Sequence, residues 1–178
     1  MAVVGNLEFI KSATGTSVSS LSVTDCFSAS YDVYAIKLDA DGYNANSLLT
    51  LQLIDNTDTT ISTTSYDNAS LLLRTDITYS ELRATGDNVL FNRVLGFFDY
   101  NNGAREGGSG IIYIFNPYTA DYTFATCQSS SDYKTGQMTG QKGIGVLKTT
   151  DVITGFHITQ DVYTATYSDI NASVFGVK

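Results

Sequence analysis

Apolar and polar residues alternate along several stretches of this chain, most clearly at residues 31–39, 48–55, 154–167 and 170–178. In these stretches large apolar side chains recur at every second position, and the residues between them are mostly polar or small. The in-phase apolar positions are Tyr34, Ile36 and Leu38; Leu49, Leu51 and Leu53; Phe156 and Ile158; and Phe175 and Val177. A period of two, with many β-branched and aromatic residues, predicts half-buried β-strands.

Turn-forming residues separate these strands. Clusters of Asp, Asn, Gly, Ser and Thr begin at Asp39, Asp55, Asp99 and Ser129. Strands that recur about every 10 to 15 residues between such turns are typical of an all-β sandwich. One short helical turn is expected from Ser80, an N-cap residue, to Gly86, a stop residue. We therefore predict a single-domain antiparallel β-sandwich, jelly-roll-like, with at most one or two short helical turns.

The glycine-rich stretch "GGSGIIYIFNPYT" (residues 107–119) raises the question of a phosphate-binding loop. Dinucleotide and P-loop motifs need a strand, then glycines, then a helix whose N-terminus meets the phosphate. Here the glycines precede a strand that is apolar on both faces and ends at Pro117, and "GQKGIGV" from Gly140 likewise leads into a strand at residues 144–147. We expect a central strand, entered from a long loop in which glycine allows a sharp turn, and no phosphate site.

Composition and charge narrow the class of partner. The chain has 178 residues, of which 43% are apolar and 16% charged, as expected for one globular domain. Its formal charge of −8 opposes binding to nucleic acid and to anionic membranes, which attract Lys and Arg. The N-terminus lacks the basic and apolar regions of a secretory signal, so synthesis in a cytoplasm is expected. Cys26 and Cys127 are then expected to be buried, reduced thiols, with a disulfide as the alternative.

Candidate catalytic and metal-binding residues are few. The single histidine, His157, is expected to face solvent from a strand, and no GxSxG motif indicates a serine nucleophile. Glu8, Glu81 and Glu106 are the only glutamates, and none has the context of a glycosidase acid. The stretch from Asp39 resembles the start of a calcium loop but lacks EF-hand spacing, so a plain hairpin turn is favoured. We predict no catalytic residue, no metal ion and no cofactor, and hence a protein that is not an enzyme.

Four segments together resemble a family of small β-rich structural proteins of tailed phages, most nearly those of contractile-tailed phages of marine cyanobacteria. The segments are "CFSASYDVYAIKL", "SYDNASLLLRT", "GIIYIFNPYTADYTFATCQSS" and "VITGFHITQDVYTATYSDINASVFGVK". The family pattern falls on residues 31–38, 108–117 and 153–178, and Phe175 replaces its commoner tyrosine. The resemblance runs from about Phe27 onward. It implies a virion component with a jelly-roll-like sandwich and no enzymatic role, on the capsid, tail, baseplate or fibre.

On this interpretation the protein is a repeated subunit that decorates or cements the capsid or tail exterior of a virion. It would bind other virion proteins and form a homo-oligomer through its surface. Residues 27–178 would form the sandwich domain, and residues 1–26 either an inter-subunit arm or an edge strand of that domain. The candidate partner contacts are Val3, Leu7, Phe9, Val18, Asn101, Asn102, Arg105, Glu106, Tyr118, Tyr122 and Tyr133.

Carbohydrate binding at the host surface is the alternative function. Tyr118, Tyr122 and Tyr133 lie in or near predicted loops, where a tyrosine ring can offer a sugar a flat apolar face and a hydroxyl group. The chain has no tryptophan, the largest stacking side chain, which weakens this alternative. A hydrolase that uses Glu106 has the least support.

Overall fold

The computed structural model describes residues 6–41, 48–75, 79–95, 107–134, 137–160 and 166–178, and every regular element in them is a β-strand. The strands are β1 (Leu7–Val18), β2 (Ser20–Val23), β3 (Val33–Asp41), β4 (Leu49–Asp55), β5 (Tyr66–Arg74), β6 (Ser80–Asp87), β7 (Gly107–Phe115), β8 (Thr123–Lys134), β9 (Gln137–Leu147), β10 (Ile153–Gln160) and β11 (Tyr167–Val177).

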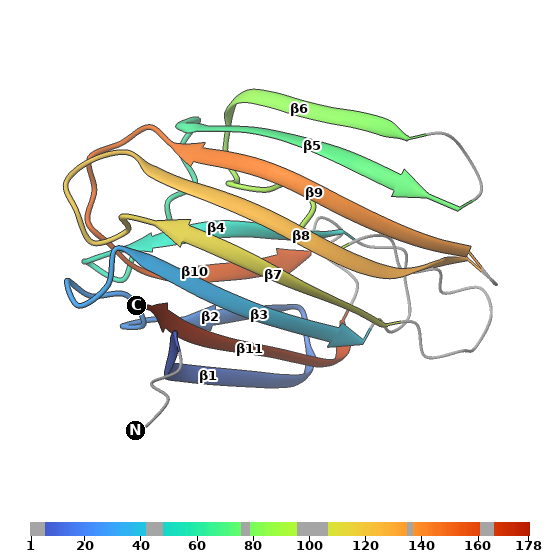
Figure 1. The fold of residues 1–178 in the computed structure, drawn as a ribbon, viewed down its shortest axis with the longest axis horizontal. Helices are drawn as coiled ribbons and strands as arrows, with labels where there is room; N and C mark the ends of the chain where they lie inside the picture. Colours follow the sequence, from blue (N-terminus) through green and yellow to red (C-terminus); the bar gives the residue numbers. More distant parts are fainter. Residues whose placement is uncertain (1–5, 42–47, 76–78, 96–106, 135–136, 161–165) are drawn as a thin grey trace.

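The strands form two antiparallel sheets of unequal size. The large sheet has eight strands in the order β1-β11-β3-β7-β8-β9-β5-β6, and the small sheet has three in the order β2-β10-β4. The small sheet lies against one face of the large sheet, so the molecule is a two-layer sandwich (Figure 1). The predicted all-β antiparallel sandwich is therefore confirmed. Its strands divide eight against three, unevenly between the layers.

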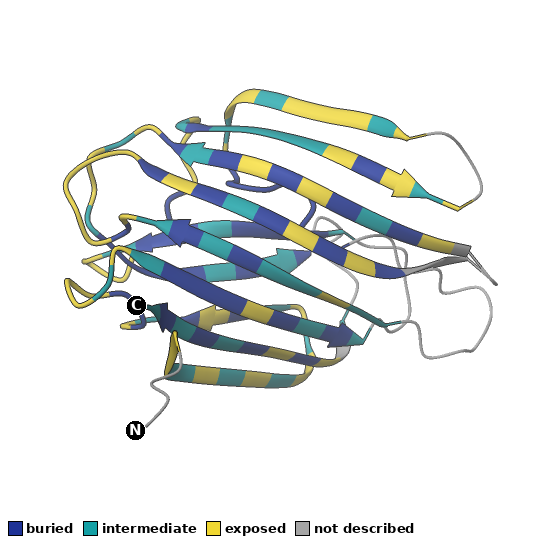
Figure 2. Cartoon of the chain, in the orientation of Figure 1, coloured by how far each residue is buried: buried dark blue, intermediate teal, exposed yellow. Residues whose placement is uncertain are grey.

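The core lies between the sheets and is built from the alternation seen in the sequence (Figure 2). Three of the four predicted sets face inward and are completely buried in strands β3, β4 and β10. These residues are Tyr34, Ile36, Leu38, Leu49, Leu51, Leu53, Phe156 and Ile158. In β11 the inward positions are instead Ile170, Ala172 and Val174, while Phe175 and Val177 are in phase on the outward face.

An irregular segment, residues 88–95, extends the small sheet beside β4. The Leu90 and Val94 amides donate hydrogen bonds to the Leu51 and Leu49 carbonyls, over 2.8 Å and 2.6 Å, and the Leu51 amide donates to the Phe91 carbonyl. Gly145 in β9 lies beneath this segment, and a Cβ atom there would stand 2.7 Å from the Leu90 carbonyl oxygen. The missing side chain on β9 therefore lets the two layers approach closely.

Two sequence-based predictions about glycine and serine are corrected. Residues 107–110 belong to strand β7 itself, where a Cβ at Gly108 would stand 2.6 Å from the Ser131 Cβ, so these glycines serve close packing and not a loop turn.

The stretch 129–143, predicted as a turn cluster, is mostly strand: β8 continues to Lys134 and β9 begins at Gln137. Its polar residues Ser129, Ser131, Thr139 and Gln141 are buried on the inward face.

Two predictions about local elements are also corrected. The expected helical turn from Ser80 is strand β6, because pairing with β5 outweighs the modest helix propensity of this short segment. Gly86 is not a stop residue but lies at a bulge in β6, between the pairs that Thr85 and Asp87 form with β5; its φ is +64° and its amide donates to the Asp67 carboxylate over 2.8 Å. The hairpin expected after Asp39 is absent, since β3 and β4 belong to different sheets, and residues 42–47 lie outside the described residues.

Candidate functional site

The outward face of the small sheet is polar along most of its three strands. Its outward positions are Ser20, Ser22, Thr50, Gln52, His157 and Thr159. Such a face needs nothing beyond solvent to cover it, as is usual for one side of an antiparallel sheet.

The outward face of the large sheet is different, because two rows of mostly apolar side chains cross all eight strands. We call these two rows the outer stripe. In strand order, the first row is Leu7, Val177, Val33, Phe115, Phe124, Val146, Asp67 and Thr85. The second row is Phe9, Phe175, Ala35, Tyr113, Thr126, Ile144, Ala69 and Arg83. Phe9, Phe124 and Ile144 are 59%, 51% and 62% exposed, so the stripe includes large apolar side chains in solvent.

The outer stripe is corrugated. One hollow of about 630 Å³, which we call the outer hollow, lies over β7, β8, β9, β5 and β6 and includes Phe115, Phe124, Val146 and Ala69 in its lining. A second hollow, of about 620 Å³, lies over β11, β3, β7 and β8 and includes Ala35 and Phe175. Small residues contribute to each lining, Ala69 and Gly145 in the outer hollow and Ala35 and Gly110 in the second hollow, while the exposed side chain of Ile144 forms part of the wall of the outer hollow.

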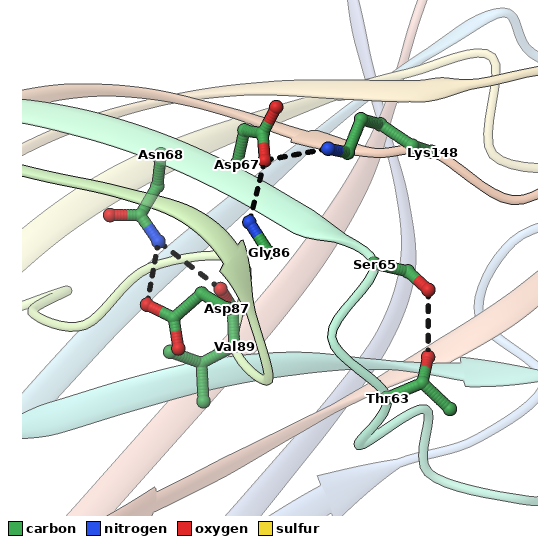
Figure 3. Close-up of polar contacts among 8 residues, drawn as sticks. All are labelled: Thr63, Ser65, Asp67, Asn68, Gly86, Asp87, Val89 and Lys148. Carbon is green, nitrogen blue, oxygen red and sulfur yellow. Dashed lines mark hydrogen bonds and ion pairs between the residues drawn. The ribbon is translucent and has the colours of Figure 1, made fainter.

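Polar groups beside the outer hollow are bound within the chain (Figure 3). The Asp67 carboxylate forms an ion pair with Lys148 over 2.8 Å, and this hydrogen bond, helped by the Gly86 amide, lowers the pKa of Asp67. The Asn68 amide nitrogen donates to the Asp87 carboxylate and to the Val89 carbonyl, over 3.2 Å and 3.3 Å. With these groups engaged, the hollow offers a partner mainly apolar surface.

The edge of the stripe at β1 is formed by an aromatic pair. Phe9 and Phe175 meet edge to face with ring centroids 5.8 Å apart. Beside them Glu8 forms an ion pair with Lys178, and this hydrogen bond, together with one from Tyr31, lowers the pKa of Glu8. The charged groups at this edge are therefore paired as well.

At the other end of the same outward face, β1, β11 and β3 carry polar and acidic residues, whereas β5 and β9 carry the exposed apolar residues Leu73 and Met138. Asp41 and Asp169 are opposite each other on β3 and β11, and Asp39 lies two residues away with an ion pair to Lys37. Thr16 on β1 donates to the Asp169 carboxylate over 2.9 Å. Away from the outer stripe, this face is therefore acidic on β11 and β3 and partly apolar on β5 and β9.

The structure places some of the sequence-predicted contact residues at this stripe. Leu7 and Phe9 belong to it, whereas Val18, at the far end of β1, packs against the core. The whole of β1 pairs with β11 as an edge strand of the large sheet, and β2 belongs to the small sheet.

The other predicted contacts lie elsewhere in the chain. Tyr118 and Tyr122 are 41% and 48% exposed in the connection between Phe115 and Thr123, next to the centre of the stripe. The side chain of Tyr133 is not described. Val3, Asn101, Asn102, Arg105 and Glu106 lie outside the described residues.

Sequence reasoning missed the centre of the stripe, Phe115, Phe124, Ile144 and Val146. The sequence does contain a signal for this surface: the segment "GIIYIF" is apolar on both faces. That pattern predicts a central strand with both faces buried. Inward Ile112 and Ile114 are fully buried, but the outward residues of β7 are only partly covered. An apolar outward face on a central strand was the sequence feature that pointed to this surface.

The residues considered for catalysis do not assemble into a site. The Nδ1 atom of His157 lies 2.7 Å from the Ser22 hydroxyl, and burial lowers its pKa with no carboxylate contributing. Glu8 and Glu81 lie on β1 and β6, the opposite edges of the large sheet, too far apart for a carboxylate pair.

Cysteine and metal chemistry give no further site within the described part of the chain. Cys26 and Cys127 are free and buried, as predicted, and burial raises the pKa of each thiol to about 12. No group of three or more His, Cys, Asp or Glu side chains is placed to hold a metal ion among the described residues. In the same residues no helix could span a membrane.

Comparison with known proteins adds no relative: no protein-family model matches this chain, and no curated protein matches it.

Proposed function

We propose that this chain is a non-enzymatic structural protein of a tailed-phage particle, a repeated subunit on the exterior of the capsid or tail. The outer stripe would be its principal protein-docking surface. The observation that carries the proposal is the outer stripe, two mostly apolar rows in which Leu7, Phe9, Phe124 and Ile144 are more than half exposed, because soluble monomers rarely expose large contiguous apolar patches without a partner. The phage context rests on the sequence resemblance alone.

The chemistry of the stripe favours a protein partner. A sugar site needs several hydrogen-bonding groups directed at the ligand, whereas Asp67 and Asn68, beside the outer hollow, bond within the chain. Aromatic and aliphatic side chains dominate the remaining surface, as in the core of a protein–protein interface.

The test is the presence of the protein in particles of the phage that encodes it. Gradient-purified particles should contain it in many copies, measured by quantitative mass spectrometry. Replacing Phe124 and Ile144 by Asp should remove it from particles while circular dichroism shows the folded sandwich. The matched control, Ser22→Asp with Gln52→Asp on the small sheet, should be incorporated normally. Particles that lack the wild-type chain would rule out the proposal.

Carbohydrate binding at the host surface is retained as a second candidate because Tyr118 and Tyr122 are both exposed in the connection between β7 and β8. Their rings could stack on sugars. A glycan array probed with the purified chain tests this directly. Binding that Tyr118→Ala and Tyr122→Ala abolish, and that Phe124→Asp leaves intact, would favour this candidate, and no binding to any glycan would dismiss it.

A further inference from the structure

The second row of the outer stripe has an ordered pattern of side-chain size. From β1 to β6 it reads Phe9, Phe175, Ala35, Tyr113, Thr126, Ile144, Ala69 and Arg83. The centre of the sheet lies between β7 and β8. Positions equally distant from that centre carry one large and one small side chain: Phe175 with Ala69, Ala35 with Ile144, and Tyr113 with Thr126.

We propose that the outer stripe binds a second copy of this chain, face to face, about a twofold axis that runs parallel to the strands between β7 and β8. This rests on the proposed function of the stripe as a docking surface and names its occupant. Such an axis places each strand over the strand at the mirrored position of the other sheet, β11 over β5 and β3 over β9. Isologous contact of this kind is the commonest form of homodimer.

In this arrangement large side chains of one copy meet small ones of the other. Phe175 faces Ala69 in the outer hollow of the second copy, and Ile144 faces Ala35 in its second hollow. Phe9 lies over Arg83, where an aromatic ring and a guanidinium group attract each other. Each hollow therefore receives a projecting side chain, and the same contact occurs twice by symmetry.

The centre of the first row supports the same axis. Phe115 and Phe124 are neighbours across β7 and β8, at the centre of the sheet. The twofold axis brings Phe115 of one copy to Phe124 of the other, so that four phenyl rings gather at the middle of the interface. Large aromatic side chains at the centre of an interface contribute most of its binding energy.

The size of the face suits a stable dimer. Eight strands at the usual spacing make a sheet about 34 Å wide, and nine-residue strands are about 30 Å long. The outward face therefore offers on the order of 1,000 Å², against the roughly 800 Å² per partner in typical stable complexes. The stripe would form the apolar part of the interface, and the polar residues beyond it on β11 and β3 part of the rim.

Charge placement permits self-association even though the chain carries a formal charge of −8. The ionised groups at the stripe occur as pairs, Asp67 with Lys148 and Arg83 with Glu81. The carboxylates Asp39, Asp41 and Asp169 lie toward the other end of the face. Lys37 and Lys142, one row beyond the stripe, come opposite each other, and their long side chains can extend to solvent at the margin.

Sedimentation velocity of the full chain over a range of concentrations tests whether the dimer exists. The wild type should change from monomer to dimer as concentration rises, with Kd on the order of micromolar. Ile144→Asp should weaken association by at least about tenfold, since it buries an unpaired charge, and Gln52→Asp on the small sheet should leave it unchanged. A wild type that stays monomeric at the highest concentration, or equal effects of the two variants, would overturn the proposal.

Cross-linking tests the axis itself. Phe9→Cys and Arg83→Cys are surface changes at opposite edges of the sheet, and the native Cys26 and Cys127 are buried and unreactive. A bis-maleimide that spans about 10 Å, the usual separation of packed sheets, should join the two variants only when they are mixed. Either variant cross-linking to itself would contradict the proposed axis.

The two proposals fail separately. A dimer that cross-links as expected, from a chain that is absent from purified particles, would reject the virion role and keep the twofold interface. A chain that is abundant in particles and monomeric in solution, with no cross-link in the mixture, would reject the interface and keep the virion role.

Discussion

The two outward faces of this sandwich are built on the same backbone pattern but carry different side chains. The face of the small sheet is covered by serine, threonine, glutamine and histidine, and the face of the large sheet is crossed by the outer stripe. Both sheets already bury apolar side chains on their inward faces. Folding therefore does not require apolar residues on the outside of the large sheet, and the difference points to association.

The comparison also separates two uses of an aromatic residue. Phe156 on β10 faces inward and is 0% exposed, whereas Phe124 on β8 faces outward and is 51% exposed. The same side chain should stabilise the fold in the first position and the proposed interface in the second.

The largest expected effect follows from this contrast. Phe156→Ala should lower the free energy of unfolding by about 3 to 5 kcal/mol, because it removes a fully buried ring and leaves a cavity between the layers. Phe124→Ala should lower it by less than about 1 kcal/mol, while it weakens self-association. Urea denaturation at a concentration that keeps the chain monomeric measures both changes. Equal losses of stability would show that the stripe belongs to the folding core.

A smaller effect is expected at Tyr66, which ties the large sheet to the small one. Its hydroxyl accepts a hydrogen bond from the Leu53 amide over 3.1 Å and donates to the Ile61 carbonyl over 3.0 Å, in a fully buried site. Tyr66→Phe should lower the free energy of unfolding by about 1 to 3 kcal/mol, because it leaves the buried Leu53 amide and Ile61 carbonyl without a hydrogen-bond partner. The exposed Tyr122 provides the control, since Tyr122→Phe should leave the denaturation midpoint unchanged. A neutral Tyr66→Phe variant would mean that water replaces the hydroxyl.

Alternation in the sequence was sufficient to predict the strands that build the core. Leu49, Leu51 and Leu53 repeat at every second position and all three are fully buried in β4. The turn after Asp55 was predicted from its residue type, and its carboxylate accepts hydrogen bonds from the Thr57 and Thr59 amides. Both features depend on residues close together in the sequence, so local pattern was enough.

Features that depend on distant parts of the chain could not be predicted in this way. The glycines from Gly140 were predicted to lead into a strand at residues 144–147, but β9 already begins at Gln137, and the Leu90 backbone that crosses Gly145 comes from a distant part of the chain. Ser80 to Asp87 contains good helix formers and becomes an edge strand only because β5 is available for pairing. The stripe itself combines residues from all eight strands, and their alignment depends on a register that no single segment reveals.

The smallest expected effect concerns the polar face. Burial lowers the pKa of His157 below its usual 6.5, so the folded state favours the neutral imidazole, which bonds to Ser22. The unfolded chain binds a proton near pH 6.5, so this contribution to stability is complete above that pH and is lost as pH falls through the lowered value.

His157→Gln keeps a polar partner for Ser22 and removes the titration. Between about pH 7 and pH 5, the denaturation midpoint of the wild type should fall slightly, and that of the variant should stay level. Dimerisation should not change over this range, because the stripe's carboxylate, Asp67, has a pKa held below its usual 3.8 by Lys148. A dimer that weakens in parallel with His157 protonation would mean that the two faces are coupled through the core, and the separation between a solvated face and a docking face would no longer hold.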